Sequence, residues 1–111
     1  MLIHKNCEAM KFQLVIQFRP TGALDFEKLV AMEDALITEL GDSAIVDGHD
    51  IGSGEFNIFV VTDHPKESFV RTQRLLEGMK PEGAMNVAYR DPNDERFVIL
   101  WPPNSSEFWT D

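Results

Sequence analysis

The spacing of hydrophobic residues changes along the chain in a fixed order, and this order constrains the fold more than any other feature of the sequence. In residues 12–18 every second position holds a large apolar residue, which is typical of a strand with one buried face. The alternating residues are Phe12, Leu14, Ile16 and Phe18. Beyond Arg19-Pro20-Thr21-Gly22 the apolar residues recur at helical spacing instead. The second half of the chain repeats this exchange, which predicts a fold of mixed helices and strands.

The first helix is predicted over residues 26–40. Asp25 can accept hydrogen bonds from the free amides of the first turn, and Gly41 suits the position that ends many helices. The predicted buried stripe consists of Phe26, Leu29, Val30, Leu36, Ile37 and Leu40. A second helix is predicted to open at Asp63-His64-Pro65 and to end before Pro81. Its weaker apolar face consists of Phe69, Val70, Gln73, Leu76 and Met79.

Two strands, 44–46 and 56–62, are expected to form a hairpin around the segment between them, because Gly52-Ser53-Gly54 tolerates the positive φ of tight turns. Strands are also predicted over residues 85–89 and 97–101. The order is β-α-β-β-α-β-β, and its first six elements follow the ferredoxin-like pattern of an antiparallel sheet with both helices on one face. We therefore expect an α+β, ferredoxin-like sandwich with an extra C-terminal strand.

The chain has the length and composition of a single domain, since it comprises 111 residues of which 43% are hydrophobic. The ferredoxin-like domain is expected over residues 10–103, between an N-terminal extension of residues 1–9 and a tail of residues 104–111. The single cysteine, Cys7, cannot form an internal disulfide. No apolar run approaches the roughly 20 residues of a membrane span, and residues 1–9 lack the apolar stretch of a signal peptide. A cytoplasmic protein without membrane contact is expected.

The net charge of −9 argues against nucleic acid as a partner. The ten Lys and Arg residues are outnumbered by nineteen Asp and Glu residues, and they are scattered along the chain rather than gathered in a basic stripe. Such a surface repels phosphate backbones. It favours solubility and can steer a basic partner toward the protein.

The sheet face without helices is expected to be partly covered. In strand 56–62 both alternating sets contain large apolar residues, and strands that are apolar on both sides are usually buried on both. Two coverings are available: a second copy of the chain, since C2 dimers are the commonest oligomers, or the tail with its aromatic residues Phe108 and Trp109. On the first strand this face carries Gln13, Val15, Gln17 and Arg19.

The segment DGHDIGSGE, residues 47–55, permits a structural and a functional interpretation. In the structural one, Gly48 supplies a bulge, Gly52 and Gly54 supply a tight turn, and the neighbouring acids bond local amides. The functional one depends on the strand register, because neighbouring residues of a strand point to opposite faces.

One register places Asp47 and His49 on the helix-free face beside Asn57. A register shifted by one residue places Asp50 there and turns His49 toward the helices, and a bulge at Gly48 allows Asp47 and Asp50 to point the same way. The sequence leaves these alternatives open. The candidate ligand-binding residues are Asp47, His49, Asp50, Asn57, Gln13 and Gln17.

A histidine near a carboxylate can perform general acid–base chemistry, but no nucleophile has a recognisable context. Ser53 lies in the predicted turn and Cys7 in the extension. Asp63 and His64 lie at the far end of strand 56–62, roughly 20 Å from the turn at about 3.3 Å per residue, so one metal site cannot use them with the hairpin residues. We expect no metal and no cofactor, and we assign no catalytic residue.

Residues 47–65, DGHDIGSGEFNIFVVTDHP, resemble a motif of small bacterial proteins of ferredoxin-like fold and uncharacterised function. In that motif a Gly-His-Asp-x-Gly-Ser-Gly hairpin precedes an Asn-Ile-Phe strand and a Thr-Asp-x-Pro helix start. The rest of the chain agrees with these proteins in element order only. The resemblance implies the ferredoxin-like fold, implies no activity, and indicates that five hairpin residues act as a unit. These residues are Gly48, His49, Asp50, Gly52 and Gly54.

Two functions are compatible with these features. The first is a non-enzymatic binding or interaction module that uses the acidic surface and the partly apolar open face. It would hold a protein partner, a second copy of itself or a small molecule, as a toxin-immunity inhibitor or a small-ligand regulator does. The second is a small enzyme or ligand sensor centred on His49 with Asp47, Asp50 and Asn57.

Overall fold

The structure, a computed structural model, describes residues 12–19, 26–52, 54–79 and 84–102. In these residues strands and helices alternate in the order that the hydrophobic spacing predicts. The elements are β1 (Phe12–Arg19), α2 (Phe26–Leu40), the short 3₁₀ helix η1 (Gly41–Ser43), β2 (Ala44–Gly52), β3 (Glu55–Thr62), α3 (Pro65–Met79), β4 (Ala84–Arg90) and β5 (Val98–Trp101).

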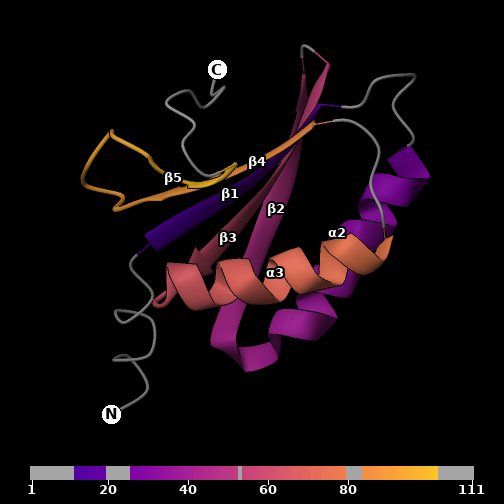
Figure 1. Ribbon diagram of the computed structural model, residues 1–111, viewed down its shortest axis with the longest axis horizontal. Coiled ribbons are helices and arrows are strands. Elements are labelled where there is room, and N and C mark those ends of the chain that lie inside the picture. The colour runs from indigo at the N-terminus through magenta and orange to yellow at the C-terminus, as the bar shows by residue number, and fades with distance from the viewer. Residues whose placement is uncertain (1–11, 20–25, 53, 80–83, 103–111) are drawn as a thin grey trace.

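The strands form one antiparallel sheet in the order β2-β3-β1-β4-β5. Both helices lie against the same side of this sheet, and β5 extends it beyond β4 (Figure 1). The predicted α+β class is confirmed, and the arrangement is consistent with a ferredoxin-like sandwich. The order of elements departs from the six-element ferredoxin-like pattern because β5 adds a strand at the β4 edge.

The core lies between the helices and the sheet and is built from alternate residues of the two central strands. Every core residue of β1 and β3 is at most 1% exposed. These residues are Leu14, Ile16, Phe18, Phe56, Ile58 and Val60. Burying an apolar side chain of this size contributes about 1.5–3 kcal/mol relative to leaving it in water, so this alternation holds the sheet against the helices.

Helix α2 packs on the sheet with a stripe that differs in part from the predicted one. Leu29, Leu36 and Leu40 are buried as predicted, and Met32, which was not predicted, is buried with them. Ile37 is 51% exposed, so its predicted burial is wrong. It follows Leu36 directly, and a step of about 100° around the helix carries it away from the contact with the sheet.

Helix α3 contacts the sheet partly through small polar residues where the sequence predicted apolar ones. Ser68 and Thr72 are buried, whereas Val70, predicted to be buried, is 44% exposed. The hydroxyl oxygens of Ser68 and Thr62 lie 2.8 Å apart and share a hydrogen bond, so both polar groups can be buried at low cost. The prediction is right for Leu76, which is 1% exposed, and wrong for Val70 because it counted only apolar residues.

Strand β2 is longer than predicted and runs through the glycine-rich segment to Gly52. Its pairing with β3 shifts between Val46 and Gly48, which leaves Asp47 as the extra residue of a β-bulge. Gly48 has a φ of 122° and Gly54 a φ of 77°, conformations that residues with a side chain rarely adopt. The bulge predicted at Gly48 is therefore confirmed.

Some predictions concern residues outside the described part of the chain. These are the N-terminal extension, the helix-start residue Asp25, and the tail with Phe108 and Trp109. Of the helices that the structure describes, neither has both the length and the apolar character that crossing a bilayer requires.

Candidate functional site

A row of four polar side chains crosses the helix-free face of the sheet. Asp50 of β2 lies opposite Asn57 of β3, and Asn57 lies opposite Gln17 of β1. Gln17 in turn lies opposite Asn86 of β4. Directly opposed residues of neighbouring strands are about 4.5–5.5 Å apart, so these four residues form a continuous set that we call the polar row. Each is one position out of step with the core residues of its strand and therefore points away from the helices.

His49 points in the opposite direction, toward the helices. It is paired with Ile58, a core residue of β3. Its Nδ1 lies 2.9 Å from Oε1 of Glu33 on α2, and its ring stacks on Phe56 with ring centroids 5.2 Å apart. Of the registers that the sequence left open, the structure has the one in which Asp50 faces the helix-free side and His49 faces the helices.

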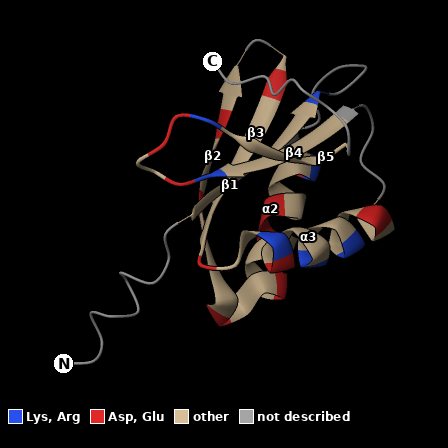
Figure 2. Ribbon diagram, turned by 60° about the vertical axis from the view of Figure 1, so that its left-hand side comes forward, with Lys and Arg blue, Asp and Glu red and all other residues tan. Residues whose placement is uncertain are grey.

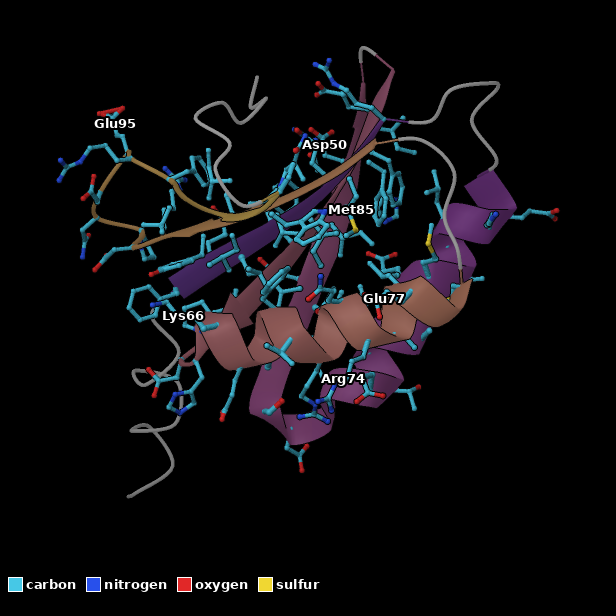
Figure 3. The ribbon with its side chains drawn as sticks, in the orientation of Figure 1. Asp50, Lys66, Arg74, Glu77, Met85 and Glu95 are labelled. Atoms are coloured by element: carbon cyan, nitrogen blue, oxygen red, sulfur yellow. The ribbon has the colours of Figure 1, made fainter. Side chains whose placement is uncertain are left out.

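A groove lies on the helix-free face and includes two residues of the polar row. Its volume is about 360 Å³, within the range of about 300–1,000 Å³ that is typical of small-molecule sites. Asp50 and Glu95 both line the groove and lie far apart in Figure 3, so the groove is elongated. Its lining consists of Gln13, Val15, Asp50, Asn57, Phe59, Arg90, Glu95 and Phe97.

Arg90 is held in a fixed position at one end of the groove. Its Nε donates a hydrogen bond of 3.1 Å to Oε1 of Gln13, and its guanidinium carbon lies 5.3 Å from the ring centroid of Phe97. Within the described residues, no hydrogen bond or ion pair involves the two terminal nitrogens of Arg90. A guanidinium that is oriented at Nε and stacked on a ring presents its outer edge to an acceptor.

The polar row has hydrogen-bonding capacity that its neighbours leave unfilled. Gln17 is fully buried, yet neither Oε1 nor Nε2 has a partner among the described residues. The same holds for Oδ1 of Asn57, which lines the groove, and for Nδ2 of Asn86. An unsatisfied buried polar group costs about 1–3 kcal/mol, so these atoms lower the stability of the described part of the sheet.

Several charges around the groove are already paired. Arg19 donates from Nε to Oε2 of Glu55 at 2.9 Å, and Glu55 is only 4% exposed. The connection between β4 and β5 carries charges of both signs (Figure 2). There the side chain of Arg96 bonds Asp94 and lowers the pKa of that carboxyl. Asp50, by contrast, is exposed and has no hydrogen bond or ion pair within the described residues.

The structure brings together three of the six residues predicted to bind a ligand. Gln13, Asp50 and Asn57 line the groove. Gln17 belongs to the polar row on the same face and is buried, whereas Asp47 is exposed at the bulge. His49 lies on the other face of the sheet and takes no part in the groove. That the first three residues bind a ligand stays a prediction.

Five residues that line the groove were not among the predicted ligand-binding residues: Val15, Phe59, Arg90, Glu95 and Phe97. A signal for Arg90 was present, because Val87 is a core residue and alternation along the strand places Arg90 on the opposite, helix-free face. Glu95 and Phe97 lie in the irregular connection between β4 and β5, where residue spacing predicts no direction for a side chain.

The groove presents groups of several chemical kinds. The groove offers carboxylate and amide oxygens as acceptors, guanidinium and amide groups as donors, and aromatic and aliphatic surface between them. In the described ranges, no three His, Cys, Asp or Glu side chains gather as metal ligands would. Comparison of the chain with protein-family models, with curated proteins and with solved structures finds no match.

Proposed function

We propose that the protein is a ferredoxin-like binding module that holds a small polar molecule in the groove on its helix-free face and does not convert it chemically. The observation that carries the proposal is the groove itself, about 360 Å³ in volume, with the Arg90 guanidinium and the Asp50 carboxylate at its ends and Val15 and Phe59 between them. Most of the residues that line it are polar or charged, and Val15, Phe59 and Phe97 add apolar surface, so the groove suits a polar molecule.

An enzyme or sensor centred on His49 together with Asp50 is less well supported. A general acid and a general base that act together must both reach the same bound substrate, each within hydrogen-bond distance of its own atom. His49 faces α2 and stacks on Phe56, while Asp50 faces the opposite side of the sheet. The two side chains therefore have no common substrate position.

A thermal-shift screen tests the proposal. The panel comprises amino acids, short peptides, nucleotides and divalent metal chlorides, and the wild type is compared with Asp50→Ala and His49→Ala. A ligand that binds only the folded protein stabilises it by about 2.7 kcal/mol at a hundred times its Kd. We expect at least one organic compound to stabilise the wild type.

The two variants form a matched pair, because the substitutions are adjacent on β2 but lie on opposite faces. The stabilisation should be lost or strongly reduced in Asp50→Ala and kept in His49→Ala. The opposite pattern would move the site to the helix side of the sheet. If no compound of the panel stabilises the wild type, the small-molecule function is wrong.

A further inference from the structure

We infer that the ligand of this groove is an elongated amphoteric molecule, with an amine at one end and a carboxylate at the other, of the size and chemistry of a short peptide with free ends. The inference rests on the proposed small-molecule function and names the class of ligand. It is carried by the different chemistry of the two ends of the groove and by the distance between them.

The Arg90 end fits a carboxylate. The bond from Nε to Gln13 and the contact with Phe97 fix the plane of the guanidinium, and the terminal nitrogens lack described partners. A fixed guanidinium edge matches the two oxygens of a carboxylate, and little side-chain freedom is lost when they meet. Gln13 adds its own amide nitrogen as a further donor at this end.

The Asp50 end fits an amine. Asp50 contributes an exposed carboxylate without a described partner, and the opposed Asn57 also lines the groove. An ammonium group has three donors and no acceptor, so it can donate to the Asp50 carboxylate and pair with its charge. A ligand carboxylate at this end would face Asp50 with like charge.

The register of the sheet sets the distance between the ends. Gln13 and Gln17 are four residues apart on β1, or about 13 Å at about 3.3 Å per residue. Arg90 lies opposite Gln13, and Asn57 lies opposite Gln17. The long side chain of Arg90 shortens this span, and an extended tripeptide covers about 10 Å.

The middle of the groove is apolar. Val15 and Phe59 are opposed on β1 and β3 and lie between the two rows that hold the ends. Val15 is only 3% exposed, so the apolar surface that a ligand side chain can cover there comes mainly from the half-buried Phe59. Glu95 also lines the groove, from the β4–β5 connection, and is displayed far from Asp50 in Figure 3. Its negative charge opposes the ligand carboxylate, so Glu95→Gln should strengthen binding a few-fold.

Calorimetric titration with alanine peptides tests the inference. Alanine, dialanine, trialanine and tetraalanine are compared, followed by trialanine with an acetylated amine and trialanine with an amidated carboxylate. Affinity should rise with length up to trialanine and then level off. Each end block should weaken binding about tenfold or more, because each removes a charge-assisted hydrogen bond.

Two variants assign each end of the ligand to its residue. Arg90→Gln should weaken the binding of trialanine about tenfold, and this variant should bind trialanine and its amidated form with equal affinity. Asp50→Asn should weaken the binding of trialanine similarly, and this variant should bind trialanine and its acetylated form with equal affinity. Arg90→Lys, which keeps the charge and loses the planar pair of donors, should bind with intermediate affinity. Circular dichroism confirms that each variant is folded, and the blocked peptides test both ends on the unchanged protein.

The results distinguish an error in the inferred class of ligand from an error in the proposed small-molecule function. If trialanine binds and both end blocks leave its affinity unchanged, the inference is overturned. It is also overturned if trialanine fails to bind while another compound of the screen binds in a manner that requires Asp50; the proposed function then stands. If neither trialanine nor any compound of the screen binds, both are wrong.

Discussion

Asp50 and His49 are neighbours in the sequence and have opposite roles in the structure. His49 is part of the packing, because its Nδ1 lies 2.9 Å from Glu33 Oε1 and its ring stacks on the fully buried Phe56. Asp50 is exposed on the other face of the strand and lines the groove. The two neighbours therefore lie on opposite faces of the sheet, His49 against the helices and Asp50 in the groove.

The first prediction concerns this separation. His49→Ala removes a ring contact and a side-chain hydrogen bond, and we expect it to lower the free energy of unfolding by about 1–2 kcal/mol. Asp50→Ala removes an exposed side chain and should change it by less than about 0.5 kcal/mol. Urea denaturation monitored by circular dichroism measures both values. A larger loss in Asp50→Ala than in His49→Ala would contradict the assignment.

The second prediction concerns the fully buried side chain of the polar row. Gln17→Leu replaces an amide that has no described partner by an apolar group of similar size, so the free energy of unfolding should rise by about 1 kcal/mol. Gln13→Leu is the matched control, because Gln13 accepts a hydrogen bond from Arg90 and its loss should cost about 0.5–1.5 kcal/mol. Urea denaturation of the two variants beside the wild type measures both changes in the free energy of unfolding. A fall in Gln17→Leu would show that the amide is satisfied.

At the scale of elements, the β2–β3 hairpin determines which side chains reach the groove. The bulge at Asp47 shifts the register by one residue, and this shift sends Asp50 to the helix-free face. Gly48 allows the bulge, because its φ of 122° is strained for any residue with a Cβ atom. The glycine-rich segment therefore determines, through its bulge, that Asp50 lines the groove.

The third prediction tests the role of this glycine. Gly48→Ala should lower the free energy of unfolding by about 1–3 kcal/mol through backbone strain, since no atom of the described residues, the chain neighbours aside, lies within 4 Å of the added Cβ. Gly52→Ala is the control, because it is equally open but has no positive φ, and its effect should stay within about 0.5 kcal/mol. Equal effects of the two substitutions would contradict the explanation.

Sequence patterns predicted the elements well and the faces of the helices only in part. The alternation of Leu14, Ile16 and Phe18 predicts their burial directly, because a strand has only two faces and alternate residues share one of them. A helix has a continuous circumference, and the contact of α3 includes Ser68 and Thr72, whose hydroxyl groups gave no hydrophobic signal.

The candidate site was predictable only where strands determine direction. Gln13, Asp50 and Asn57 were named as candidates, but their grouping required the register, and the register depends on one bulged residue. Two segments distant in the sequence close the groove. Arg90 could have been placed by alternation, whereas Phe97 could not, because it lies in an irregular connection.

At the scale of the whole molecule, the net charge of −9 acts on both stability and ligand choice. Mutual repulsion among nineteen acidic residues opposes the compact state, and a ligand with a positive group is favoured over an anion. Self-association of the chain stays a prediction, which light scattering of the purified protein tests.

The fourth prediction follows from this charge. Raising the sodium chloride concentration to about 1 M shortens the Debye length to about 3 Å and screens the repulsion, so the melting temperature should rise. The gain should correspond to about 1 kcal/mol or less, because the individual charge interactions are mostly exposed. Potassium chloride should give the same shift. A fall in melting temperature with both salts would contradict a stability limited by self-repulsion.

A nuclear magnetic resonance titration with trialanine tests most directly whether the helix-free face binds the ligand. The side-chain amide signals of asparagine and glutamine report where the peptide binds. Gln13, Asn57, Gln17 and Asn86 all lie on that face, whereas Gln73 lies on α3 and serves as the internal control. If the peptide binds in the groove, the signals of Gln13 and Asn57 shift most and the Gln73 signal stays in place. Shifts confined to Gln73, or none at saturating peptide, would contradict binding in the groove.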